Sequence, residues 1–209
     1  MLGLKIFGMS RLRLKFLLFS LLFIFPAPSV FSLEPALSPP RKVIKVFDGD
    51  TIVVSPYEKV RIIGIDTMEV HDGEKLSRQA RIYKLKEKEI KKQGDRGKKI
   101  AEKLLGGKFV RLAPGREAHD DYGRTLAYVY FTMPEDKFAK VMGEKYSGPR
   151  PAPERQYMFD RVMVQYGWAQ ALTHYPFDYL NEFVELETSA KKNRLGIWKS
   201  LLREKSAKK

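Results

Sequence analysis

The sequence contains no cysteine and only three histidines among its 209 residues. Without cysteine the chain forms no disulfide, offers no thiolate nucleophile and cannot bind zinc or an iron–sulfur cluster through sulfur. His71, His119 and His174 show no metal-ligand spacing, so each is interpreted as a surface or supporting residue. A metal must therefore be bound by oxygen atoms or by these few histidines, which narrows the possible metal chemistry.

Acidic residues are scarce relative to basic ones. The 39 Lys and Arg residues outnumber the 25 Asp and Glu residues, which gives a net charge of +14 and a pI of about 9.8. Such an excess attracts polyanions, either nucleic acid or an anionic membrane, although it also serves solubility alone. The remaining composition, 44% hydrophobic and 31% charged, indicates one ordinary globular domain.

The first 32 residues have the pattern of an export signal. Four basic residues precede the apolar run 16–25, and prolines follow it. This order predicts a secretory signal peptide over 1–32, cleaved after Ser32. The run is shorter than the roughly 20 residues that span a bilayer, so an uncleaved membrane anchor is the less favoured alternative. Cleavage lowers the net charge from +14 to +10, and residues 33–41, which contain three prolines, are predicted to be a linker.

The mature chain, with a domain predicted over 42–200, shows strand patterns first and helical patterns later. Runs rich in β-branched and aromatic residues predict strands at 42–47, 51–54, 60–65, 109–112 and 125–131. Five short strands with a helix inserted after the third are typical of a barrel of the oligonucleotide-binding (OB) type. The expected fold class is therefore α+β, a mainly β barrel with about three helices.

Helical spacing of apolar residues predicts helices at 97–105, 159–166 and 179–192. Two further segments are expected to be insertions: a charge-dense helical excursion, exposed or mobile, near 70–95, and an irregular stretch rich in Gly and Pro near 133–156. Residues 196–198 are expected to dock on the core, and 201–209 to form a basic tail that frays from Arg203 onward.

Three carboxylates follow predicted strand ends or turns, namely Asp50, Asp66 and Glu69. Converging carboxylates repel one another unless a cation lies among them, and flexible oxygen ligands suit Ca²⁺. Arg61 and Arg124 belong to neighbouring motifs, and guanidinium groups bind phosphate oxygens in a bidentate manner. A hard cation, two arginines and a spare carboxylate would suit hydrolysis of a phosphodiester.

Each motif also has a simpler interpretation. The sequence Asp48-Gly49-Asp50 is a common hairpin turn, and Asp66 could cap a helix. The segment 122–124 could be another turn with a solvated arginine. Only the order and spacing of the motifs together are specific.

Taken in order, the motifs resemble the staphylococcal nuclease (thermonuclease) family. The resemblance runs from about Val43 to Trp198 through the segments 46–51, 60–69, 120–127, 166–169 and 195–198. It implies an OB-like five-stranded barrel with three helices. It also implies Ca²⁺-dependent endonucleolytic cleavage of DNA and RNA to products with 3′-phosphate ends.

The resemblance also implies roles for individual residues. Asp50 and Asp66 would bind Ca²⁺ through their carboxylates, and Thr67 through its backbone carbonyl. Glu69 would be the general base or would orient water.

Two arginines and two tyrosines complete the implied site. Arg61 and Arg124 would hold the scissile phosphate, with Arg124 assisting the leaving oxygen. Tyr122 and Tyr175 match nucleotide-contacting tyrosines.

The sequence departs from the family pattern at two positions. Met68 replaces the usual proline, which removes a backbone constraint just before Glu69. Asp121 replaces a basic residue, which lowers the expected phosphate affinity there. Strand alternation would also place Arg61 and Asp66 on opposite faces, so a bulge or bend is predicted near Gly64.

Three hypotheses follow. The first is an exported nuclease, secreted or periplasmic, that acts as a monomer on DNA and RNA without a stable protein partner. The second is a non-catalytic OB-fold module that binds single-stranded nucleic acid. The third is a membrane-tethered envelope protein whose charge serves lipid binding.

Overall fold

The computed structural model describes residues 36–207, so the predicted signal peptide at 1–32 lies outside the described residues. Within 36–207, no helix has both the length and the apolar character needed to cross a bilayer. Residues 36–40 of the predicted linker have no regular structure, and Ser38 donates its backbone N–H to the carbonyl of Leu112 at 2.8 Å.

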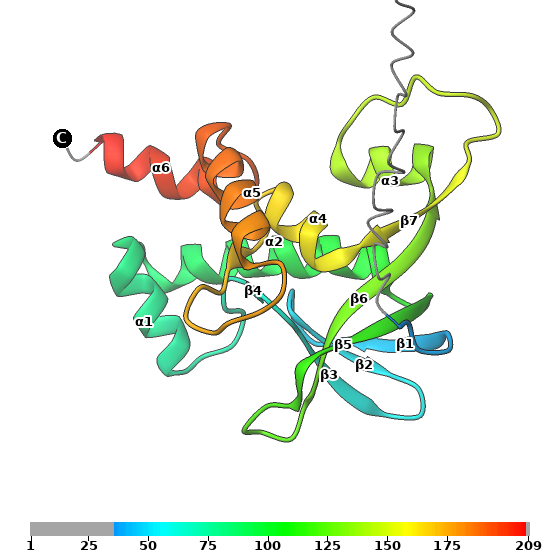
Figure 1. Cartoon of the computed structure of the whole chain (residues 1–209). Coiled ribbons are helices and arrows are strands. Elements are labelled where there is room, and N and C mark those ends of the chain that lie inside the picture. The colour runs from blue at the N-terminus through cyan, green and yellow to red at the C-terminus, as the bar shows by residue number, and fades with distance from the viewer. Residues whose placement is uncertain (1–35, 208–209) are drawn as a thin grey trace, which may run out of the picture. The chain divides into compact units, whose positions relative to one another are not determined.

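Four strands open the described chain, and helices and further strands follow (Figure 1). In order, the elements are β1 (Arg41–Val46), β2 (Thr51–Val54), β3 (Glu58–Ile62), β4 (Ile65–Asp66), α1 (Glu74–Tyr83), α2 (Glu87–Leu105), β5 (Phe109–His119), β6 (Thr125–Pro134), α3 (Glu135–Met142), β7 (Glu154–Met158), α4 (Phe159–Gln165), β8 (Gln170–Ala171), α5 (Leu180–Lys192) and α6 (Trp198–Ala207).

Five strands form a closed barrel. The strands follow the order β3-β2-β1-β5-β6, and β3 also pairs with β6, which closes the sheet. The closing pair is parallel and aligns Arg61 with Leu126, whereas the other pairs in the barrel are antiparallel. β7 extends the sheet from β6 outside the closure. The predicted OB-like barrel is confirmed.

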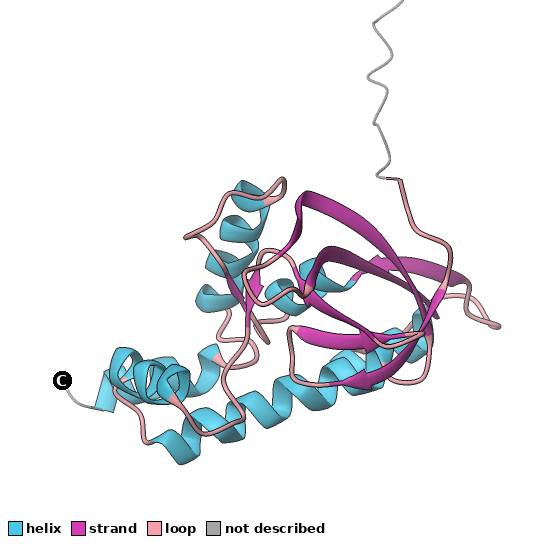
Figure 2. Cartoon of the chain, turned by 90° about the horizontal axis from the view of Figure 1, so that it is seen from below, coloured by secondary structure: helices cyan, strands magenta, loops and turns pink. Residues whose placement is uncertain are grey.

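The core has two parts. Alternating residues of the strands, such as Val60 and Ile62 of β3, fill the barrel together with α4 and the second half of α2. A smaller cluster lies outside the barrel, where α1, the first half of α2, α5 and α6 meet. We call this smaller group the satellite core; its buried members are Met68, Leu76, Leu85, Ile90, Ala190, Ile197, Trp198 and Leu201. Figure 2 shows the long helix α2 running beneath the barrel and beyond it.

The helical prediction was wrong in number and in one boundary. Among residues 36–207 there are six helices rather than about three. The segment expected to be an exposed excursion forms α1 and the first half of α2, and the predicted helix 97–105 is the second half of α2. Leu76 and Ile90 are fully buried in the satellite core, so the segment is packed despite its density of charge.

Two further expectations are corrected. The predicted irregular insertion 133–156 contains the end of β6, the helix α3 and the start of β7, which pairs with β6. The basic tail does not fray at Arg203, because α6 continues to Ala207 and Leu201 is buried in the satellite core. The expected docking of residues 196–198 is confirmed, since Ile197 and Trp198 are also buried there.

The predicted bend near Gly64 is confirmed. The expected strand 60–65 ends at Ile62 and resumes as β4 at Ile65, which pairs with β8 in a separate small sheet. Gly64 has a φ of 76°, and a Cβ there would lie 2.6 Å from the Phe177 ring. Glycine therefore suits both the turn and the close approach. The turn redirects the chain so that Asp66 can face Arg61.

Candidate active site

Asp50 lies immediately before β2 and is almost completely buried. Its Oδ2 accepts hydrogen bonds from the backbone N–H of Thr67 at 2.9 Å and from the Thr67 hydroxyl at 2.8 Å. Its Oδ1 lies 3.0 Å from Nη1 of Arg61 and accepts a bond from the Thr51 hydroxyl at 3.2 Å. The preceding turn is fixed by Asp48, whose Oδ1 accepts the Asp50 N–H. Asp50 therefore joins the β1–β2 turn to the segment after β4.

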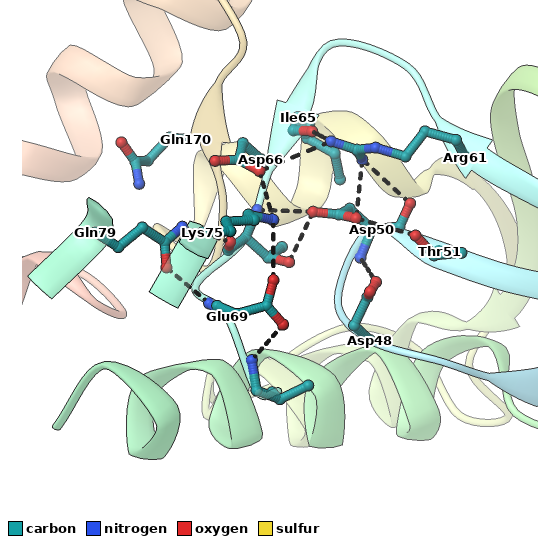
Figure 3. A network of polar contacts seen from close by, with 12 residues as sticks. Asp48, Asp50, Thr51, Arg61, Ile65, Asp66, Glu69, Lys75, Gln79 and Gln170 are labelled. Atoms are coloured by element: carbon teal, nitrogen blue, oxygen red, sulfur yellow. Dashed lines mark hydrogen bonds and ion pairs between the residues drawn. The ribbon is translucent and has the colours of Figure 1, made fainter. Parts of the chain in front are cut away.

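Arg61 extends from β3 across this junction (Figure 3). Its guanidinium donates to the backbone carbonyls of Asp50, Ile62 and Ile65 at 2.8 to 3.2 Å. Its Nη2 also lies 3.8 Å from Oδ1 of Asp66. The side chain is only 12% exposed. Arg61 is thus a rigid positive charge between Asp50 and Asp66.

Glu69 is held at its backbone and at one carboxylate oxygen. Its N–H donates to Oε1 of Gln79 at 2.8 Å, and its own Oε1 accepts the N–H groups of Val70 and His71 at 2.9 and 3.0 Å. The other oxygen, Oε2, lies 3.7 Å from Nζ of Lys75. Met68 does not leave this backbone loose, because it is buried in the satellite core.

Two site residues, Lys75 and Gln79, were not predicted. Both project from α1, one helical turn apart, toward the segment 66–69 (Figure 3). Nζ of Lys75 lies 2.9 Å from Oδ1 of Asp66, and Nε2 of Gln79 donates to the Thr67 carbonyl at 3.1 Å. Their spacing of four residues just after Glu69 is the only sequence signal that could have indicated them.

The charges of the site shift several pKa values. Burial acts to raise the pKa of Asp50, but Arg61, Lys75 and the bonds from Thr67 outweigh it and lower the pKa to about 2. Burial and the nearby Asp50 raise the pKa of Asp48 to about 6. Burial acts to lower the pKa of Lys75, but the surrounding carboxylates outweigh it and raise the pKa. Asp50 and Lys75 are therefore both charged at neutral pH.

The donors fit a hard cation in their chemistry. The carboxylates of Asp50 and Asp66 and the carbonyl of Thr67 are oxygen ligands of the kind that Ca²⁺ takes. Within residues 36–207, however, no three His, Asp or Glu side chains converge closely enough to enclose a metal ion. The ammonium of Lys75 lies between Asp66 and Glu69 instead.

Arg124 lies outside this network of contacts. It precedes β6, two residues before Leu126, and Leu126 is the register partner of Arg61. Its guanidinium binds Oδ2 of Asp120 at 2.6 Å, and its Cζ lies 5.4 Å from the centre of the Tyr122 ring. The segment 120–124 is thus a turn stabilised by its own contacts, one strand away from Arg61.

The two predicted tyrosines are solvent-exposed. Tyr122 is 85% exposed on the β5–β6 turn, and Tyr175 is 67% exposed between β8 and α5. Neither contacts the carboxylates. Asp121, next to Tyr122, is exposed as well. The structure therefore brings together Asp50, Arg61, Asp66, Thr67 and Glu69, and leaves Arg124, Tyr122 and Tyr175 apart from them.

Comparison with known proteins adds independent evidence. The sequence model of the family described as "Staphylococcal nuclease homologue" matches residues 59–200. An uncharacterized protein of Methanocaldococcus jannaschii is 31% identical over 168 residues, which cover 75% of this chain and 70% of that protein. Thermonucleases of Staphylococcus intermedius and Staphylococcus hyicus are 29% and 26% identical over 160 and 161 residues, covering 75% of this chain and 74% of each relative.

Proposed function

The chain belongs to the family of staphylococcal nuclease homologues, and from this premise we propose that it is a Ca²⁺-dependent endonuclease that hydrolyses DNA and RNA to products with 3′-phosphate ends. The observation that carries the proposal is the convergence of Asp50, Arg61, Asp66, Thr67 and Glu69 from separate segments (Figure 3). The basic charge of the chain supports a polyanionic substrate.

The proposed metal would be held by the carboxylates of Asp50 and Asp66 and the carbonyl of Thr67. When bound, Ca²⁺ supplies positive charge to the phosphate oxygens. The protein prepares these donors in advance, because Asp50 orients Thr67 through two hydrogen bonds and Gln79 fixes the Thr67 carbonyl.

Glu69 is proposed to orient the attacking water and to accept its proton. The two backbone bonds to Oε1 fix the carboxylate and leave Oε2 directed toward the cluster. The water oxygen forms a bond to phosphorus and gives its proton to Glu69. The bond between phosphorus and the 5′ oxygen breaks, this oxygen takes up a proton from solvent water to become a hydroxyl, and the 3′ oxygen keeps the phosphate. A rigid carboxylate at hydrogen-bond distance from water is what general-base catalysis requires.

The arginines are proposed to stabilise the phosphate in the transition state. Arg61 is fixed by three backbone carbonyls, so its charge is already in place before the substrate binds. Arg124 is paired with Asp120, and a phosphate competes with that carboxylate for the guanidinium. Arg124 then hydrogen-bonds the departing 5′ oxygen. Both groups act on the phosphate and not on bases, which gives broad substrate choice.

A plasmid assay tests the enzymatic proposal. The purified chain lacking residues 1–32 is incubated with supercoiled plasmid in Ca²⁺, and in parallel with a chelator. We expect nicked and linear DNA in the tube with Ca²⁺ and supercoiled DNA in the tube with the chelator. Plasmid that stays supercoiled in both tubes, although the protein retards it in a gel, would favour the binding module instead.

We also propose that the protein is exported and cleaved after Ser32, into the periplasm or the medium. The sequence of residues 1–32 supports this, and mass spectrometry of the mature protein tests it. A mature mass that includes residues 16–25 would instead favour a membrane-tethered form.

A further inference from the structure

The ammonium of Lys75 lies between Asp66, a proposed cation ligand, and Glu69, the proposed base. Its Nζ is 2.9 Å from Oδ1 of Asp66 and 3.7 Å from Oε2 of Glu69. The buried carboxylate of Asp50 also attracts it. Three carboxylates therefore share two cations, Arg61 and Lys75.

The two cations differ in how firmly they are held. Arg61 donates to three backbone carbonyls and is 12% exposed, so it cannot leave without breaking those bonds. The Lys75 side chain is 33% exposed, and within residues 36–207 it is held only by the carboxylates of Asp66 and Glu69. A lysine has a flexible four-carbon stem and a strongly hydrated head, so its charge can move into water.

The helix that carries Lys75 does not need to move with it. Leu76 of α1 is buried in the satellite core, and Gln79 bonds both to the Thr67 carbonyl and to the Glu69 N–H. Lys75 is the second residue of α1, at the end that faces the carboxylates. Its side chain can therefore swing away while α1 and the segment 67–69 stay in place.

We propose that Lys75 is an internal counterion that competes with the divalent cation for Asp66, next to the base Glu69, and so sets the affinity of the site for the metal. Without a divalent ion, the ammonium offsets the repulsion among the carboxylates. When Ca²⁺ binds, Lys75 moves into solvent. The inference rests on the metal ligands of the proposed function but does not depend on catalysis.

Calcium binding without nucleic acid tests the competition. Isothermal titration calorimetry of Lys75→Met is expected to show Ca²⁺ binding at least about tenfold tighter than the parent, because an opposing charge is removed. Lys91→Met is the matched control: Lys91 is also 33% exposed, but it pairs with Asp72, away from the cluster. Lys75→Arg keeps the charge and is expected not to tighten binding. Equal or weaker binding by Lys75→Met, or equal tightening in Lys91→Met, would overturn the proposal.

A second measurement uses the unaltered chain and so does not depend on the folding of a variant. Lysines are acetylated briefly with the N-hydroxysuccinimide ester of acetic acid, with and without Ca²⁺. The extent of modification at each lysine is then quantified by mass spectrometry. Acetylation of Lys75 is expected to increase severalfold in Ca²⁺, while that of Lys91 stays constant. If Ca²⁺ binds and the reactivity of Lys75 is unchanged or lower, the competition is wrong.

The two proposals can fail separately. If Lys75→Met tightens Ca²⁺ binding but no variant cleaves the plasmid, the counterion role stands and the catalytic proposal fails. If the plasmid is cleaved in Ca²⁺ and Lys75→Met does not change Ca²⁺ affinity, the nuclease stands and the counterion role fails. If neither the parent nor Lys75→Met binds Ca²⁺, the proposed metal ligands themselves are wrong and both proposals fall.

Discussion

The carboxylates of the candidate active site differ in how their oxygens are occupied. Both oxygens of Asp50 accept hydrogen bonds or pair with Arg61, so Asp50 holds the site together. Glu69 uses Oε1 for two backbone N–H groups, while among the described residues Oε2 has only the long contact to Lys75. Glu69 is therefore the carboxylate best prepared to take a proton from water.

Replacing Glu69 by Gln is expected to lower the rate of plasmid cleavage by about 10²- to 10⁴-fold, since the amide cannot accept the proton. The fold should persist, because an amide oxygen can still accept the N–H groups of Val70 and His71. Gel assays in Ca²⁺ measure the rate, and circular dichroism checks the fold. Glu102→Gln, an exposed change on α2, is the control and should cleave at the parent rate. Equal cleavage rates for Glu69→Gln and the parent would exclude Glu69 as the general base.

Replacing Arg124 by Ala is expected to lower cleavage by about 10²- to 10³-fold, because a positive charge at the phosphate is lost in the transition state. Its loss also leaves Asp120 without its partner, so stability is measured alongside turnover. Arg116→Ala is the control: Arg116 also pairs with one aspartate, Asp178, and is exposed. An Arg124→Ala protein that folds and cleaves as fast as the parent would remove Arg124 from the proposed mechanism.

Asp160 is a buried titrating residue that is not one of the proposed site residues. It is fully buried on α4, where its Oδ2 accepts the Val129 N–H at 3.0 Å and its Oδ1 has no partner in the described chain. Burial raises its pKa to about 8, although that hydrogen bond and nearby arginines act in the opposite direction. The folded chain thus keeps a proton that the unfolded chain releases near pH 4. Between about pH 4 and 8 the free energy of unfolding therefore falls as the pH rises.

Asp160→Asn should remove this loss, because the amide stays neutral. The variant and the parent are expected to have similar free energies of unfolding near pH 4.5. For each further pH unit up to pH 8, the free energy of unfolding of the variant should exceed that of the parent by up to about another 1.4 kcal/mol. Urea unfolding at several pH values measures the difference. A constant difference across the pH range would mean that Asp160 is ionised in the folded chain.

At the scale of elements, α2 supports the segment that carries Glu69. Gly94 of α2 lies so close to this segment that a Cβ would come within 2.6 Å of the Met68 carbonyl and 2.7 Å of the Glu69 carbonyl. A Cβ at Gly97, one turn further along α2, would meet only the Trp168 carbonyl at 3.5 Å, an ordinary contact. The helix and the 68–69 backbone are therefore in direct contact at one glycine.

Gly94→Ala and Gly97→Ala form a matched pair on one helix. Alanine favours a helix over glycine, so Gly97→Ala should stabilise the chain by about 0.5 to 1 kcal/mol. Gly94→Ala should instead destabilise it by about 1 to 3 kcal/mol, because backbone atoms must shift, and should slow cleavage by displacing Glu69. Urea unfolding and the plasmid assay measure both. If both changes stabilise the chain and cleavage is unaffected, α2 does not position Glu69.

At the scale of the whole molecule, the barrel could be predicted because its strands carry local signals. Runs such as 42–47 and 51–54 are rich in β-branched residues, and strict alternation indicated the bend at Gly64. The satellite core carried no such signal. Leu76 and Ile90 are isolated among charged residues, and their burial depends on α6, more than a hundred residues later. A local sequence pattern cannot predict contacts between residues that are more than a hundred positions apart.

The same distinction applies to the site. Asp50 directly precedes β2, Asp66 ends β4 and Glu69 follows it, so all three lie at or near strand ends and their convergence could be expected once a barrel was predicted. Lys75 and Gln79 reach the site only because α1 packs on the satellite core. In the sequence they stand among many other polar and charged residues, so no local pattern distinguishes them. Arg124 is brought to one strand away from Arg61 by the parallel pairing of β3 with β6, which no local pattern indicates.

The net charge of the whole molecule leads to a prediction about binding. Cations displaced from DNA make the logarithm of the binding constant fall linearly with the logarithm of salt concentration, by about 0.9 for each phosphate neutralised.

Lys59, whose Nζ lies 4.5 Å from the Phe47 ring, is exposed on β3 next to the site. We use a Glu69→Gln background, which is expected to bind DNA without cutting it. In this background Lys59→Ala should make the salt dependence of binding shallower, reducing the magnitude of the slope by about 1. Lys140→Ala, on the distant helix α3, should leave the slope unchanged (Figure 1). Fluorescence anisotropy of labelled DNA at several salt concentrations measures the slopes, and equal slopes for Lys59→Ala and Lys140→Ala would place the bound DNA away from the carboxylates.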